Sequence, residues 1–105
     1  MEELTKETQK LICLVYKEYL ERRKNGFSRD NSAFFRFNFA KDIPQLLKYN
    51  PDDIESCLTE LSKKGYVKKY VDGGFKLESK GIVMMENRFK NGIKEIVSFI
   101  KQIVL

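Results

Sequence analysis

Apolar residues recur with a helical period between residues 50 and 65. Four of them follow one another at spacings of three, one and three, which places them on one face of a helix; they are Ile54, Cys57, Leu58 and Leu61. Asn50 can accept a hydrogen bond from a free amide at a helix start, and Pro51 suits the first helical position. Gly65 suits the left-handed conformation that ends many helices. The pattern therefore predicts a helix from Asn50 to Lys64.

A β-hairpin is predicted directly after this helix. The strand-forming residues are Tyr66, Val67, Tyr70 and Val71. Asp72-Gly73-Gly74 is a strong turn signal, because tight hairpin turns need positive φ angles that glycine adopts at little cost. Phe75 and Leu77 continue the return strand. Ser79 can then cap a further helix that begins near Lys80.

A long first helix is predicted from Thr5 to about Lys24, within an N-terminal segment of residues 1–26 that ends at Asn25-Gly26. Its inner face holds Leu4, Leu11, Ile12, Val15, Tyr19 and Leu20, with Tyr16 beside them. After it, Ser28-Arg29-Asp30 can cap a short helical turn.

A further helix is predicted from about Ala40 to Tyr49. Ile43, Leu46 and Leu47 would point inward. Pro44 fits best in the first turn of a helix, which places the helix start at Asp42.

Phenylalanines cluster between these two helices, from Phe34 to Phe39. Phe35, Phe37 and Phe39 alternate with polar residues, which predicts a short half-buried strand that pairs with the hairpin. Their side chains either fill the core or form an exposed aromatic platform for bases or a partner peptide. We favour the core, because clusters of exposed phenylalanine lower solubility.

The C-terminal segment, residues 79–105, predicts a helix with a broad apolar stripe. Its apolar residues recur at spacings of four, three, four and three: Phe89, Ile93, Ile96, Ile100 and Ile103, with Val97 and Val104 widening the stripe. Asn91-Gly92 can loosen this helix near its start. The stripe either packs on the first helix of the same chain or pairs two chains as a homodimer. Its breadth in so small a protein favours the homodimer, with the five spaced residues as the interface.

The motifs of the central region resemble those of a known class of proteins. Residues 58–67, LTELSKKGYV, look like the end of the recognition helix in MarR- and PadR-like winged-helix regulators. Residues 75–81, FKLESKG, are similar to the exit from their β-hairpin wing, with Glu78 where that pattern usually has threonine. The stretch from Met84 to Phe89, continuing through residues 93–96, also looks like small uncharacterised winged-helix proteins of Firmicutes and their phages, including the YjcQ type. The resemblance covers the chain from about Phe39 onward.

This resemblance implies an α+β, mainly helical fold. Residues 40–78 would form a helix-turn-helix with a β-hairpin wing, between long N- and C-terminal helices. The commonest use of such a domain is DNA binding. The resemblance thus implies a small DNA-binding protein, such as a transcriptional regulator or an accessory factor.

Composition agrees with one small domain and argues against several functions. The chain has 105 residues, 42% of them hydrophobic, and contains no histidine and no tryptophan. Without histidine it lacks the usual proton shuttle and the commonest transition-metal ligand. We expect no catalytic residues, metal or cofactor. Cys13 and Cys57 fall on apolar helix faces, as buried free thiols do. No apolar run approaches a membrane span and the charged start differs from a signal peptide, so a cytoplasmic location is expected.

The net charge of +5 is unevenly distributed. Lysines and arginines flank the predicted recognition helix, and a basic surround suits contact with DNA phosphates. A single surface lysine is ordinarily only solvated, so the prediction of DNA contact depends on the grouping of these lysines and arginines. The predicted DNA-binding residues are Ser56 and Thr59 at the groove, with Lys63, Lys64, Lys68, Lys69, Lys76, Arg36 and Lys41 around it.

The recognition helix itself argues against base contact, because residues 51–62 hold four carboxylates and no lysine or arginine. Each unpaired carboxylate in a groove is repelled by the phosphates. Asp52 and Asp53 are explained by their favourable position at a helix start. Two hypotheses remain open: DNA binding mainly through the wing and the DNA backbone, or a protein-binding module, for instance an adaptor or inhibitor encoded on a mobile element. The second would bind a basic protein through Asp52, Asp53, Glu55 and Glu60.

Overall fold

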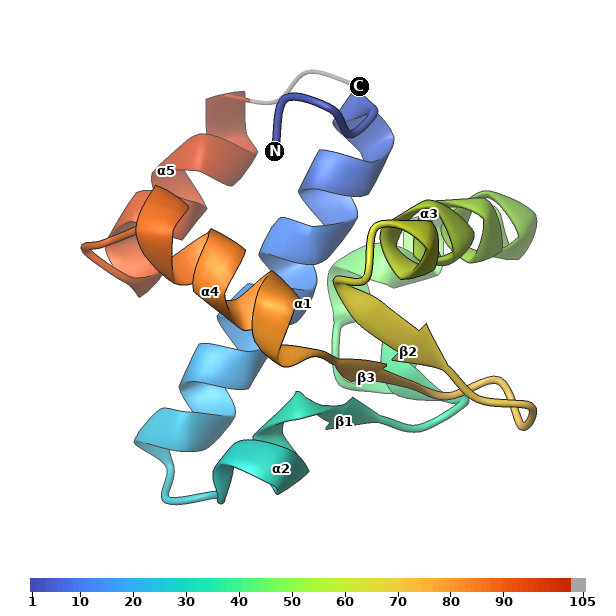
Figure 1. Ribbon diagram of the computed structural model, residues 1–105, viewed down its shortest axis with the longest axis horizontal. Helices are drawn as coiled ribbons and strands as arrows, with labels where there is room; N and C mark the ends of the chain where they lie inside the picture. The colour runs from blue at the N-terminus through green and yellow to red at the C-terminus, as the bar shows by residue number, and fades with distance from the viewer. Residues whose placement is uncertain (103–105) are drawn as a thin grey trace.

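The computed structural model describes residues 1–102 (Figure 1). The elements, in chain order, are α1 (Lys6–Lys24), α2 (Arg29–Ala33), β1 (Phe34–Phe35), the 3-10 helices η1 (Phe39–Lys41) and η2 (Pro44–Lys48), α3 (Pro51–Lys63), β2 (Val67–Lys69), β3 (Phe75–Leu77), α4 (Ser79–Arg88) and α5 (Ile93–Gln102). The prediction of a mainly helical α+β fold is confirmed.

Helix α1 lies at the centre of the molecule, with α4 and α5 on one side and α3 on the other (Figure 1). The side chains of Ile12, Cys13 and Val15 are fully buried. The predicted helix from Thr5 to about Lys24 is confirmed, and Thr5 is its N-cap, because the Thr5 side chain accepts a hydrogen bond from the Thr8 amide. Because α1 packs against four other helices, its burial extends beyond the predicted inner face to Cys13 and Leu14.

The strands form one antiparallel sheet in the order β1-β3-β2. Phe34 pairs with Lys76 and Phe35 with Phe75, so the predicted pairing of the phenylalanine segment with the hairpin is confirmed. On the other side of β3, Lys68 pairs with Lys76. The turn between β2 and β3 has Gly73 at φ +96°, the conformation for which the turn sequence was recognised.

Local chemistry defines both ends of α3 as predicted. The Asn50 side chain accepts a hydrogen bond from the Asp52 amide, and Pro51 is the first helical residue. At the other end Gly65 has φ +80°, and the Tyr66 amide donates to the Leu61 carbonyl at 3.0 Å. This closes the last turn of the helix in the manner of a Schellman motif.

The predicted helix from Ala40 to Tyr49 is wrong. The segment forms two short 3-10 helices instead, separated at Asp42 and Ile43. Pro44 has no amide hydrogen and holds the preceding Ile43 in a non-helical conformation, at φ −125° and ψ +78°, which breaks the segment. As a consequence Leu47, which was expected to point inward, is 69% exposed.

The phenylalanine cluster divides between core and surface. Phe35 and Phe39 are buried, as favoured, and both rings contact the ring of Phe75. Phe34 and Phe37 are exposed, the latter at 69%. The strand is also shorter than predicted, since only Phe34 and Phe35 pair with β3.

The prediction of one continuous C-terminal helix is also wrong. The helix is interrupted between α4 and α5, where Gly92 has φ +73°. The break turns α5 back against α1, so Phe89 and Ile96 of the predicted dimer stripe are buried within their own chain. Ile93 and Ile100 are half-buried, and Ile103 and Val104 lie outside the described residues. Pairing of two chains stays a prediction.

The start of α4 differs from the prediction by one residue. Ser79 is the first helical residue and Glu78 the residue before it, and the cap carries no side-chain hydrogen bond. The Ser79 hydroxyl instead accepts a hydrogen bond from the Arg29 guanidinium at 3.2 Å.

Candidate nucleic-acid interface

Helix α3 and the hairpin form one side of the molecule, to the right in Figure 1. With Cys57, Leu58 and Leu61 buried beneath it, the helical period turns Asp52, Ser56 and Lys63 outward. All three are exposed, whereas Thr59 is half-buried. The predicted groove contacts Ser56 and Thr59 therefore lie on or next to the outward stripe.

Glu60 faces the start of α1, away from this stripe. Its carboxylate accepts hydrogen bonds from the Thr8 hydroxyl at 2.7 Å, the Thr5 amide at 2.9 Å and the Thr5 hydroxyl at 3.1 Å. Burial raises the pKa of Glu60, but the bonds from Thr8 and Thr5 lower it by more, so this pKa lies below the ordinary value. Glu60 is thus a second cap for α1, supplied by α3.

We expect the hydrogen bonds of Glu60 to make the free energy of unfolding depend on pH in the acid range. A carboxyl with a lowered folded pKa contributes stability above its unfolded pKa and loses that contribution as pH falls through the folded value. Glu60→Gln should cost about 1 kcal/mol near neutral pH, because the amide accepts fewer of the hydrogen bonds. The variant should then lose less further stability than wild type on acidification.

Urea unfolding followed by circular dichroism, near neutral pH and again well below the ordinary glutamate pKa of 4.5, checks this expectation. Glu86→Gln removes an exposed carboxyl from α4 and serves as the matched control, which should behave as wild type. If acidification lowers the free energy of unfolding equally in Glu60→Gln and wild type, the stabilising role given to the Glu60 carboxylate is wrong.

Glu55 also has an internal partner. Its carboxylate forms an ion pair with the ammonium of Lys69 on β2. The same ammonium donates to the Thr59 hydroxyl at 3.0 Å, and that hydroxyl donates to the Glu55 carbonyl at 3.0 Å. These contacts tie α3 to the hairpin. They also occupy Lys69 and Thr59, two of the residues predicted to contact DNA.

Three lysines gather where α3 ends. The Lys80 ammonium donates to the Lys64 carbonyl at 2.8 Å and lies 5.3 Å from the centre of the Tyr66 ring. Lys63 and Lys64 are exposed beside it. We call Lys63, Lys64 and Lys80 the lysine cluster. Sequence reasoning missed Lys80 because it belongs to the next helix, although cations often bond the last carbonyls of a helix.

The remaining predicted cations lie on another surface. Side chains alternate between the two faces of a strand, so Lys68 and Lys69 point to opposite sides of the sheet. Lys69 contacts α3, which leaves Lys68 and its cross-strand partner Lys76 on the outer face. Lys76 lies 3.5 Å from the Asp30 carboxylate. Arg36 and Lys41 are exposed after β1 and in η1. The structure thus divides the predicted DNA-binding residues between two faces.

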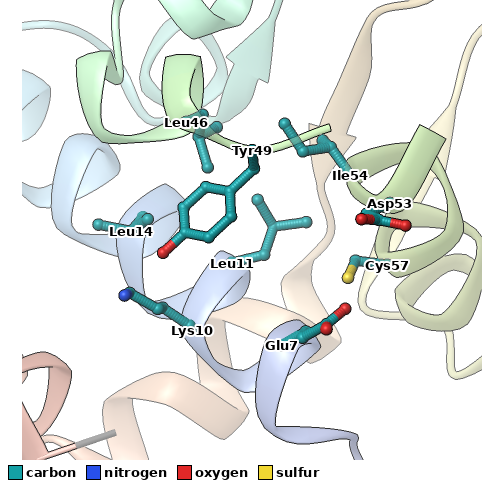
Figure 2. A pocket seen from close by; sticks show the side chains of 9 residues that line it. All are labelled: Glu7, Lys10, Leu11, Leu14, Leu46, Tyr49, Asp53, Ile54 and Cys57. Carbon is teal, nitrogen blue, oxygen red and sulfur yellow. The ribbon is translucent and has the colours of Figure 1, made fainter. Parts of the chain in front are cut away.

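A small pocket opens between α1, η2 and α3, with a volume of about 90 Å³ (Figure 2). Its lining is mainly apolar, with Leu11, Leu14, Leu46 and Ile54 around the ring of Tyr49. Cys57 lies in its wall, and burial raises the pKa of that thiol. Both cysteines are buried free thiols, as predicted.

Comparisons with protein-family models, with curated proteins and with solved structures gave no match. Within residues 1–102, no helix has the length and apolar character needed to cross a membrane. The same part of the chain contains no group of three or more metal-ligating side chains arranged around one point.

Proposed function

We propose that this chain is a small DNA-binding protein of the winged-helix type, a regulator or an accessory factor, that holds duplex DNA mainly by its phosphates. The order of elements supports this proposal. Two helices, a short strand, a 3-10 helical segment, α3 and a β-hairpin follow in sequence, and the short strand pairs with the second strand of the hairpin. In this proposal α3 is the helix that faces the groove and the β2–β3 hairpin is the wing.

The observation that supports the proposal most is that the carboxylates of Glu55 and Glu60 both have partners within the chain. The two carboxylates that most oppose an approach to phosphate are bonded internally, to Lys69 and to the start of α1. Asp52 and Asp53 remain exposed at the start of α3, where the helix dipole stabilises them. The competing hypothesis is that this acidic helix binds a basic protein. Of its four proposed contact residues, only these two would remain available.

The contacts expected on DNA are mostly independent of base sequence. The lysine cluster lies at the C-terminal end of α3, where its ammonium groups can reach phosphate oxygens. Ser56 is the exposed polar side chain in the middle of the outward stripe. Helix α3 contains no arginine, asparagine or glutamine, the side chains that read bases by paired hydrogen bonds. We therefore expect weak discrimination between DNA sequences.

Salt dependence of duplex binding tests the proposal. Each phosphate contact contributes about 0.9 to the slope of log affinity against log salt, so Lys63→Ala/Lys64→Ala should reduce that slope by roughly 2. Fluorescence anisotropy of a labelled duplex, titrated between about 50 and 200 mM salt, measures the slope. A duplex of shuffled sequence should bind wild type with similar affinity.

Lys90→Ala/Lys94→Ala is the matched control, because it removes the same charge from exposed positions in the α4–α5 connection and the first turn of α5, and these elements lie on the side away from α3 (Figure 1). Its slope should stay close to the wild-type value. Absence of duplex binding by wild type at low salt, or equal slopes for the two double variants, would contradict the proposal.

A further inference from the structure

The outer face of the sheet combines aromatic and basic side chains. Register places Phe34, Lys76 and Lys68 side by side across the three strands. Arg36 and Tyr70 lie just past the ends of β1 and β2; Arg36 lines a surface hollow together with Phe34, and the Tyr70 ring contacts the Phe34 ring. We call these five residues, Phe34, Arg36, Lys68, Tyr70 and Lys76, the outer sheet face. None is needed to fill the core, because the opposite face of the sheet supplies Phe35, Phe75 and Leu77 to it.

The two aromatic rings of this face are held in a defined arrangement. The ring of Phe34 on β1 and the ring of Tyr70, the residue after β2, meet edge to face, with centres 5.7 Å apart and planes at 89°. They are 39% and 37% exposed. Packing against each other fixes both rings while leaving part of each open to solvent, which is the condition for stacking a flat ligand.

The charges of the face are mainly positive. The Lys68 ammonium lies 5.7 Å from the centre of the Tyr70 ring, and Arg36, two residues after Phe34, is exposed. Lys76 lies between them and is partly neutralised by Asp30 of α2, at 3.5 Å. A polyanion can therefore lie across the strands with its charges near Lys68 and Arg36 and its flat groups over the rings.

We propose that the outer sheet face binds single-stranded DNA, with bases stacked on Phe34 and Tyr70 and phosphates held by Lys68 and Arg36. Unpaired bases expose their ring faces, whereas a duplex hides them in its stack. Stacking and phosphate contact use no ribose hydroxyl, so DNA suffices as the ligand. This face lies across the sheet from α3, so the proposal does not require α3 to bind a duplex.

Aromatic variants test the stacking. A labelled oligothymidylate should bind wild type, and Phe34→Ala and Tyr70→Leu should each weaken that binding about tenfold. Tyr70→Phe keeps the ring and should bind as wild type, which separates loss of stacking from loss of folding. Circular dichroism of each variant checks that the sheet is intact.

A charge variant acts in the opposite direction. Asp30→Asn releases Lys76 from its carboxylate partner and should tighten oligothymidylate binding about threefold, since it adds one phosphate contact. Phe34→Ala, on β1 and outside the wing hairpin, should leave duplex binding unchanged, and Lys63→Ala/Lys64→Ala should leave oligothymidylate binding within about twofold of wild type. The two proposals can thus fail separately.

Four results would overturn the proposal: no binding of oligothymidylate by wild type, equal binding by Tyr70→Leu and Tyr70→Phe, and binding of a polyglutamate peptide as tight as that of the oligonucleotide. The fourth is binding of oligouridylate more than about tenfold tighter than oligothymidylate, which would indicate a contact to the 2′-hydroxyl and an RNA ligand.

Discussion

Phe75→Ala is expected to destabilise the protein by about 3–5 kcal/mol, the largest effect of any substitution considered for this chain. Phe75 is fully buried in β3, the central strand of the sheet. Its ring stacks on Phe35 at 4.9 Å and meets Phe39 edge to face at 5.0 Å. Removing it leaves a cavity bounded by the buried rings of Phe35 on β1 and Phe39 on η1, and a cavity that its surroundings fill only partly adds to the cost.

Phe37→Ala is the matched control for this prediction. Phe37 belongs to the same aromatic segment but is 69% exposed, so its loss should cost less than about 1 kcal/mol. Urea unfolding of both variants measures the two losses in the free energy of unfolding. The dependence of that free energy on urea concentration is compared with wild type. A cost below about 1.5 kcal/mol for Phe75→Ala, or equal costs at the two positions, would contradict the core described for the sheet.

The contrast between Phe75 and Phe37 illustrates what the sequence predicts well. Elements defined by local chemistry were found where they were expected: α3 has the asparagine cap, the proline and the terminal glycine that the sequence indicated. The hairpin follows from its turn residues in the same way. Alternation alone could not show that Phe37 is exposed, because the pairing of β1 ends at Phe35.

Errors arose where the backbone requirements of a single residue interrupt an apolar pattern. The apolar residues from Ile43 to Leu47 fit a helix, yet Pro44 breaks the segment into 3-10 turns. The stripe from Phe89 to Ile103 fits a long helix, yet Gly92 lets the chain turn so that Ile96 is buried on α1. In both cases one residue with unusual backbone requirements decided between two patterns of similar apolar content.

The candidate sites needed the three-dimensional structure. The sequence identified Glu60 as an obstacle to DNA binding, but its partners Thr5 and Thr8 lie more than fifty positions away. Likewise, alternation predicts that Lys68 and Lys69 diverge, but it cannot show which of them meets α3. The pairing of Lys69 with Glu55 settles that point and, with it, separates the lysine cluster from the outer sheet face.

Gly81→Ala should destabilise the protein by about 1–3 kcal/mol, although alanine is normally the better helix former. Gly81 lies in the first turn of α4 and is buried. A Cβ atom built there would fall 2.5 Å from the Tyr66 carbonyl oxygen and 3.2 Å from the Leu77 side chain. That carbonyl already accepts a hydrogen bond from the Glu78 amide at 2.9 Å, so it cannot move aside without losing this bond.

The sign of the effect makes Gly81→Ala informative. Without the close approach, the higher helix propensity of alanine would stabilise α4 by up to about 1 kcal/mol. Asn87→Ala changes an exposed position of the same helix and should be neutral or slightly stabilising. Thermal unfolding by circular dichroism compares them, and about 4–8 °C of lost melting temperature is expected per kcal/mol. A higher melting temperature for Gly81→Ala would show that α4 and the start of β2 are not packed as described, and the position of Lys80 in the lysine cluster would then be wrong as well.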